Sequence, residues 1–94
     1  MIQMPPAVVF HRLAASEYRR IRRWYEVRSP LAASRVKNAI LAAVDRIAEN
    51  PFCGPTWESP TRFLKVRRYP YVIYYELLDP TLLSVFAIAH KSRR

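Results

Sequence analysis

The side chains best able to do chemistry in this sequence are basic. Lys65 and Arg67 are two residues apart, a spacing that places both on one face of a strand, and Arg68 follows them. His90 stands near the C-terminal end, directly before Lys91. Cations of this kind bind phosphate, and a histidine beside cations has its charged form disfavoured, as a general base requires. The pattern admits a phosphate-binding or proton-transferring site, or more plainly a solvated basic surface.

A run of tyrosines lies in the segment that follows these cations. Tyr71 and Tyr75 share one face of a predicted strand with Ile73, whereas Tyr74 lies on the other face. Tyrosine rings beside Lys and Arg can stack on nucleic-acid bases. The same spacing also fits tyrosines that pack in a core or at a sheet edge, so both interpretations stay open.

Arginines and aromatic residues also gather near the N-terminus. Arg19 and Arg23 are one helical step apart, Arg20 lies between them, and Trp24-Tyr25 follows. This arginine-rich helix face is either simply solvated or docks an acidic partner segment or a polyanion.

Other kinds of site find little support. A single glycine does not build a phosphate-binding loop, and the scattered carboxylates form no acid–base pair. Cys53, with only His11 and His90 to help, does not make a zinc site. We therefore expect no metal and no cofactor.

The composition predicts a small basic domain. Ninety-four residues fit one domain, over residues 1–94, and an apolar content of 51% excludes intrinsic disorder. Sixteen Lys and Arg against seven Asp and Glu give a net charge of +9, and thirteen of the sixteen are Arg. This charge points to a polyanionic partner, such as nucleic acid or an acidic protein segment. Without a signal-peptide pattern or an apolar run of ~20 residues, we expect a cytoplasmic protein that does not enter a membrane.

The periodicity predicts a short strand and then two helices. The strand covers residues 8–10. The first helix should begin near Ala14 or Ser16, with an apolar stripe at Leu13, Tyr18, Ile21 and Tyr25. The second should begin at Ser29-Pro30, a cap followed by a first-turn proline, and end at Asn50-Pro51. Its stripe is Val36, Ile40, Ala43, Val44 and Ile47.

A proline-rich loop and three strands complete the predicted fold. The loop covers residues 51–60, and the strands cover residues 62–67, 71–77 and 83–90. Their short connections favour antiparallel neighbours. The fold class is therefore α+β: a short N-terminal strand and a helical hairpin packed on a C-terminal antiparallel sheet of three to four strands.

Five segments, in this order, carry a family resemblance. They are Trp24-Tyr25, the alanine-rich residues 32–39, residues 47–51 with Gly54-Pro55, the tyrosine-rich residues 69–75, and residues 85–90 with Arg93-Arg94. In them the sequence resembles the RelE/ParE superfamily of type II toxins, small basic proteins that bacteria make with an antitoxin. The fold that the resemblance implies is the hairpin and sheet already predicted.

The two branches of that superfamily imply different activities. RelE-like toxins are ribosome-dependent endoribonucleases, and Lys65 and Arg67 match their paired cations, with His90 as a candidate base. An arginine of that catalytic set falls on Tyr71 here, and its C-terminal tyrosine has no counterpart, so the set is incomplete. ParE-like toxins instead inhibit DNA gyrase and so DNA replication, without RNA chemistry. The Trp-Tyr and Tyr-Pro-Tyr segments are closer to this branch, so the protein is more plausibly not an enzyme, with the endoribonuclease as the alternative.

The resemblance also implies partners and contact residues. The implied target is DNA gyrase, or the ribosome and mRNA for the endoribonuclease alternative. The implied partner is a cognate acidic antitoxin. The toxin–antitoxin complex would bind operator DNA only through the antitoxin. The target-binding candidates are Lys65, Arg67, Arg68, His90, Arg93 and Arg94. The antitoxin-binding candidates are Arg19, Arg20, Arg23, Trp24, Tyr25, Tyr71 and Tyr75. A basic domain without toxicity is the plainer alternative.

Overall fold

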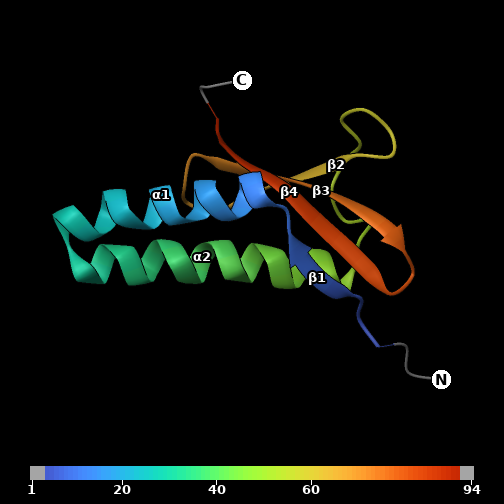
Figure 1. Cartoon of the computed structure of the whole chain (residues 1–94), viewed down its shortest axis with the longest axis horizontal. Coiled ribbons are helices and arrows are strands. Elements are labelled where there is room, and N and C mark those ends of the chain that lie inside the picture. The colour runs from blue at the N-terminus through green and yellow to red at the C-terminus, as the bar shows by residue number, and fades with distance from the viewer. Residues whose placement is uncertain (1–3, 92–94) are drawn as a thin grey trace.

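Two helices pack on one side of a four-stranded sheet in the computed structural model, which describes residues 4–91 (Figure 1). In chain order the elements are β1 (Ala7–Phe10), α1 (Arg12–Arg28), α2 (Pro30–Glu49), β2 (Arg62–Lys65), β3 (Tyr71–Asp79) and β4 (Leu82–His90). This order and arrangement confirm the predicted α+β class. Arg93 and Arg94, two of the target-binding candidates, lie outside the described residues.

The first helix begins earlier than the sequence predicted. Its cap is His11, whose Nδ1 accepts a hydrogen bond from the Leu13 N–H at 3.2 Å, so the helix starts at Arg12 and not near Ala14 or Ser16. Tyr18, Ile21 and Tyr25 of the predicted apolar stripe do pack in or against the core, but Leu13 is 53% exposed and its neighbour Ala14 is buried in its place. Histidine is an uncommon cap, which is why the start was missed.

The second helix follows after one residue. Ser29 ends α1, where its N–H donates to the Tyr25 carbonyl at 2.8 Å, and starts α2, where its Oγ accepts from the Ala32 N–H at 3.3 Å. Pro30 stands in the first helical turn. The predicted stripe of α2 is buried throughout, and the tip of the hairpin around Ser29 extends past the strands (Figure 1).

The sheet has the strand order β1-β4-β3-β2. β2, β3 and β4 are antiparallel as predicted, and β1 joins the sheet parallel to β4. β3 and β4 each run slightly longer than predicted, whereas β2 ends at Lys65, so Arg67 lies in the turn beyond it. β1 pairs only with the first four residues of β4, Leu82 to Val85.

Tyr75 joins the 51–60 loop to the sheet from inside the core. Its side chain is 0% exposed, and its hydroxyl donates to the Pro51 carbonyl at 2.8 Å and accepts from the Gly54 N–H at 3.1 Å. Burial is the largest influence on this group and raises the pKa of the Tyr75 hydroxyl above its ordinary value of about 10. Tyr75 therefore acts as an internal anchor of the loop.

Candidate functional site

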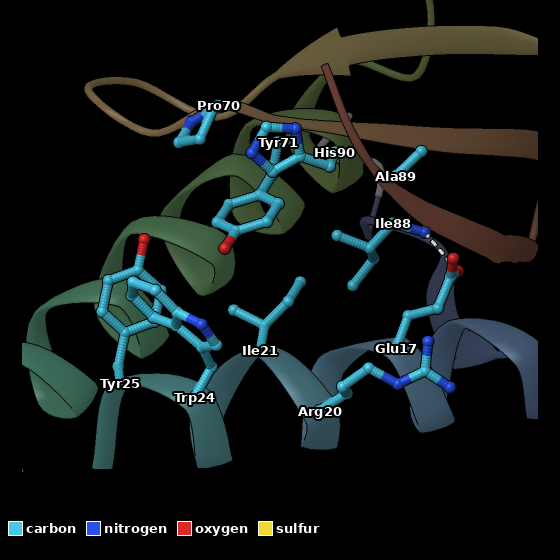
Figure 2. Close-up of a pocket in the computed structure, with 10 residues that line it drawn as sticks. All are labelled: Glu17, Arg20, Ile21, Trp24, Tyr25, Pro70, Tyr71, Ile88, Ala89 and His90. Carbon is cyan, nitrogen blue, oxygen red and sulfur yellow. Dashed lines mark hydrogen bonds between the residues drawn. The ribbon is translucent and has the colours of Figure 1, made fainter. Parts of the chain in front are cut away.

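A groove with a volume of about 440 Å³ lies between α1 and the neighbouring ends of β3 and β4 (Figure 2). α1 contributes Glu17, Arg20, Ile21, Trp24 and Tyr25, and the sheet side contributes Pro70, Tyr71 and residues 88–90. The elements place these residues together because α1 crosses the sheet beside the C-terminal half of β4, which β1 does not reach.

Aromatic rings form much of the groove wall. Trp24 and Tyr25 meet edge to face with ring centroids 4.8 Å apart, and Tyr25 meets Tyr69 at 6.0 Å. On the opposite wall the Tyr71 ring meets His90 edge to face at 5.6 Å, and Tyr71 points from β3 toward α1 (Figure 2). Ring pairs of this kind hold one another in place, so the groove presents a largely preformed surface.

Arg28 fixes the exposed indole of Trp24. The Arg28 guanidinium lies 3.4 Å from the Trp24 ring centroid and donates from an Nη atom to the Trp24 carbonyl at 2.7 Å. Trp24 nevertheless keeps 51% of its surface exposed. A fixed, half-exposed tryptophan beside cations is the type of residue that dominates binding energy at protein interfaces.

The structure brings together most of the predicted antitoxin-binding residues. Arg20, Trp24, Tyr25 and Tyr71 all line the groove, and so does His90, which was predicted for the target. Arg19 and Arg23 are exposed on α1 outside the groove. Tyr75 does not belong with them, because its fully buried side chain offers no surface to a partner. Side chains alternate between the two faces of β3, so Tyr75 shares a face with Tyr71, and at Tyr75 this face is covered by the core.

The predicted cations of the β2 region do not converge with His90. Lys65 pairs with Val72 and lies on the sheet face away from the helices, whereas His90 pairs with Tyr71 on the groove side. Arg67 and Arg68 are exposed in the turn after β2, where Arg68 has a left-handed φ of 69°. Lys65 and His90 therefore do not face one common reaction centre.

Sequence reasoning missed the polar contact that closes one end of the groove. Glu17 Oε1 accepts a hydrogen bond from the Ile88 N–H at 2.8 Å (Figure 2). The two residues are far apart in the sequence, and no local pattern marks a helix carboxylate that will meet a strand. Pro70 and Ala89 were missed for the same reason.

Two further features are absent from the described part of the chain. Within residues 4–91, no group of three or more His, Cys, Asp and Glu side chains is placed to hold a metal ion. No helix in the same range is both long enough and apolar enough to cross a membrane.

Comparison with known proteins agrees with this architecture. The fold matches a solved structure described as the chromosomal ParDE TA system from P. aeruginosa, with a TM-score of 0.76, 20% identity, and 94% of this chain and 98% of that chain covered. That structure and this chain therefore share one fold, a helical hairpin on a mixed four-stranded sheet. The sequence model of the family described as ParE toxin of type II toxin-antitoxin system, parDE, matches residues 8–94. The chain therefore belongs to the ParE toxin family; a search of curated protein sequences gives no match.

Proposed function

We propose that residues 1–94 form one cytoplasmic toxin domain that inhibits DNA gyrase, and that a cognate acidic antitoxin neutralises it by occupying the groove. The observation that carries the proposal is membership of the ParE toxin family over residues 8–94. The net charge of +9 supports a polyanionic target and an acidic partner. Operator DNA would be bound by the antitoxin and not by this chain.

The ribonuclease alternative has less support. It requires a base and phosphate-binding cations around one substrate, within hydrogen-bond reach of the reacting groups. Lys65 and His90 lie on opposite faces of the sheet, and Arg67 lies in a turn. Gyrase inhibition needs no such arrangement, because the toxin would act by binding.

A gyrase cleavage assay tests the proposed target. Purified DNA gyrase, ATP and supercoiled plasmid are incubated with and without the protein, and the products are digested with protease before electrophoresis. Accumulation of linear, protein-linked plasmid is the expected result. Normal supercoiling with no cleaved product would contradict gyrase inhibition, and a translating extract probed for mRNA cuts would then test the ribonuclease alternative.

A pair of double variants tests which cations contact the target. We propose that Lys65, Arg67 and Arg68 contact the gyrase–DNA complex, together with His90, Arg93 and Arg94. K65A/R67A should weaken inhibition about tenfold or more, since contacts between cations and phosphate dominate such affinities. R35A/K37A is the control: it also removes one arginine and one lysine, but from α2, and it should change inhibition little. Equal effects of the two variants would mean that only net charge matters.

The two tryptophans provide a matched test of the groove. Trp24 lines it, whereas Trp57 lies in the 51–60 loop with a similar exposure of 58%. W24A should cost ~2 kcal/mol of antitoxin binding, about thirtyfold in Kd, whereas W57A should leave Kd within about twofold. Because His90 also lines the groove, a bound antitoxin would cover one of the proposed target contacts. Unchanged binding by W24A would place the antitoxin elsewhere.

A further inference from the structure

The outer face of α1 carries cations that the groove does not use. Ala14 and Ile21 are the buried residues on the inner side of this helix. Because an α-helix has ~3.6 residues per turn, Arg12, Arg19 and Arg23 lie within about 40° of one another on the opposite side. All three residues are exposed, and none of them lines the groove. They form a straight row on the solvent face of the helix, the arginine row.

The fold does not neutralise the arginine row. Within residues 4–91 the one side-chain ion pair joins Arg22 to Glu26 at 3.5 Å. Glu17, the other glutamate of α1, accepts a hydrogen bond from the Ile88 N–H at 2.8 Å on the groove side (Figure 2). Both acidic side chains of the helix thus interact with other groups, and the row keeps its positive charge toward solvent.

The geometry of the row suits a chain of phosphates. From Arg12 to Arg23 it extends about 16 Å along the helix axis, at ~1.5 Å per residue. Successive phosphates of one DNA strand are ~3.4 Å apart along the duplex axis, so the row is long enough to meet several of them. Each guanidinium presents a planar set of donors that matches a phosphate group. Ser16 lies on the same side of the helix between Arg12 and Arg19, and a serine hydroxyl is a further phosphate-binding group.

The composition of this face favours nucleic acid over an acidic protein segment. Protein interfaces depend on aromatic or apolar anchors that become buried at their centre. The row has serine and not a large apolar residue in its gap, and the half-exposed Trp24 belongs to the groove on another side of α1 (Figure 2). Protein–DNA interfaces are instead polar and strongly positive, as this face is.

From this arrangement we propose that the arginine row of α1 binds the phosphate backbone of duplex DNA without regard to base sequence. The choice of DNA over RNA rests on the proposed function, in which the protein acts on a gyrase–DNA complex. Phosphate contacts carry no sequence information, so recognition of the operator sequence would stay with the antitoxin. Arg19 and Arg23, which the sequence assigned to the antitoxin, thereby contact DNA.

Duplex binding in the absence of gyrase tests this inference. The probe is a fluorescently labelled DNA duplex of mixed sequence, and Kd is measured by anisotropy at several salt concentrations. R19Q/R23Q removes two charges of the row, and glutamine and arginine have similar helix propensities, so the helix should be retained. R35Q/R46Q removes two arginines from α2 and is the matched control. Circular dichroism verifies that both variants are folded.

The two double variants should behave differently. Near 0.1 M salt, R19Q/R23Q should weaken duplex binding about tenfold and reduce the slope of log Kd against log salt by about two, because two phosphate contacts are lost. R35Q/R46Q should stay within about threefold of the wild type, because a charge outside the contact acts only through the weaker long-range field. A duplex of unrelated sequence should give the same Kd within about twofold.

Amide shifts locate the contact independently of mutation. In ¹⁵N NMR spectra of the wild type, addition of the unlabelled duplex should shift amides of α1 from Arg12 to Arg23 more than amides of α2. Shifts concentrated on α2 or on the sheet would place the DNA elsewhere and overturn the assignment.

Each contrary outcome has a distinct meaning. Equal losses in the two double variants would leave net charge as the cause and overturn the row as a site. Tighter binding of an RNA duplex of the same sequence would overturn the choice of DNA. A loss of antitoxin binding by R19Q/R23Q, with the duplex Kd unchanged, would make the row an antitoxin surface and would also overturn the inference.

The gyrase cleavage assay separates this inference from the proposed function. Row-dependent duplex binding by a protein that traps no cleaved plasmid would support the inference and contradict gyrase inhibition. Trapping of cleaved plasmid by a protein whose duplex Kd does not depend on the row would support gyrase inhibition and overturn the inference.

Discussion

Replacing Tyr75 by phenylalanine removes one hydroxyl on which two backbone groups depend. The Pro51 carbonyl and the Gly54 N–H both bond to that oxygen, at 2.8 and 3.1 Å, and the phenylalanine ring fills the same core position. A neutral hydrogen bond contributes about 1 kcal/mol net, and a buried group left without a partner costs about 1–3 kcal/mol. Gly54 is buried, whereas Pro51 is half-buried and can turn to water. We therefore expect Y75F to lose about 2–3 kcal/mol of unfolding free energy.

Urea denaturation followed by circular dichroism measures this loss. The midpoint should fall without a change in slope, and the melting temperature should fall by about 10–20 °C for a domain of this size. Y74F is the matched control, because Tyr74 is half-buried on the opposite face of β3 and packs against Trp57 and Phe63. It should stay within about 0.5 kcal/mol of the wild type. A Y75F loss no larger than that of Y74F would refute the view that this hydroxyl anchors the loop.

Three further expectations follow from the same contacts. In G54A the new Cβ would overlap the backbone carbonyl of Phe63, so urea denaturation should show a loss of about 3 kcal/mol. Hydrogen bonds from Thr81 hold the pKa of the Asp79 carboxyl below its usual range. The stability that the Asp79 carboxylate contributes is therefore present above about pH 4 and is lost as the pH falls through the lowered pKa. Carboxyl NMR titrations of the wild type and T81A should show a higher pKa of Asp79 in the variant. Because the pKa of Tyr75 is raised on folding, the stability it contributes is full below about pH 10 and is lost as pH rises toward the folded pKa; denaturation midpoints above pH 10 should therefore fall more steeply for the wild type than for Y75F.

Local patterns specified the second helix almost completely, and the first only in part. Ser29-Pro30 is a strong start signal, and the stripe from Val36 to Ile47 has one phase that fits burial. In the first helix the predicted stripe included Leu13, whereas the structure buries its neighbour Ala14, and small alanine carries little hydrophobic signal. Packing on the sheet determines that Ala14 and not Leu13 is buried, and the local sequence pattern does not predict this packing.

The candidate site was predictable where it depends on residue type and not where it depends on contacts distant in the sequence. Trp24, Tyr25 and Tyr71 stood out as aromatic residues beside cations and do line the groove. Period-two alternation placed Tyr71 and Tyr75 on one face, but the position of each along the strand determines that one reaches the groove and the other the core. Glu17 gave no signal, because its role depends on where β1 stops beside β4.

Two of the described acidic side chains accept hydrogen bonds from backbone groups and not from arginines. Glu17 accepts from Ile88 and Asp79 from Thr81, while within residues 4–91 one side-chain ion pair forms, Arg22–Glu26 at 3.5 Å on an exposed helix face. The net charge of +9 is what remains after all seven acidic residues are counted, and its self-repulsion opposes the compact state. An acidic antitoxin in the groove would lower that repulsion and, at a thousandfold excess over Kd, add about 4 kcal/mol to the stability of the fold. The same charge that attracts the proposed target would thus make the toxin more stable when it is neutralised than when it is free.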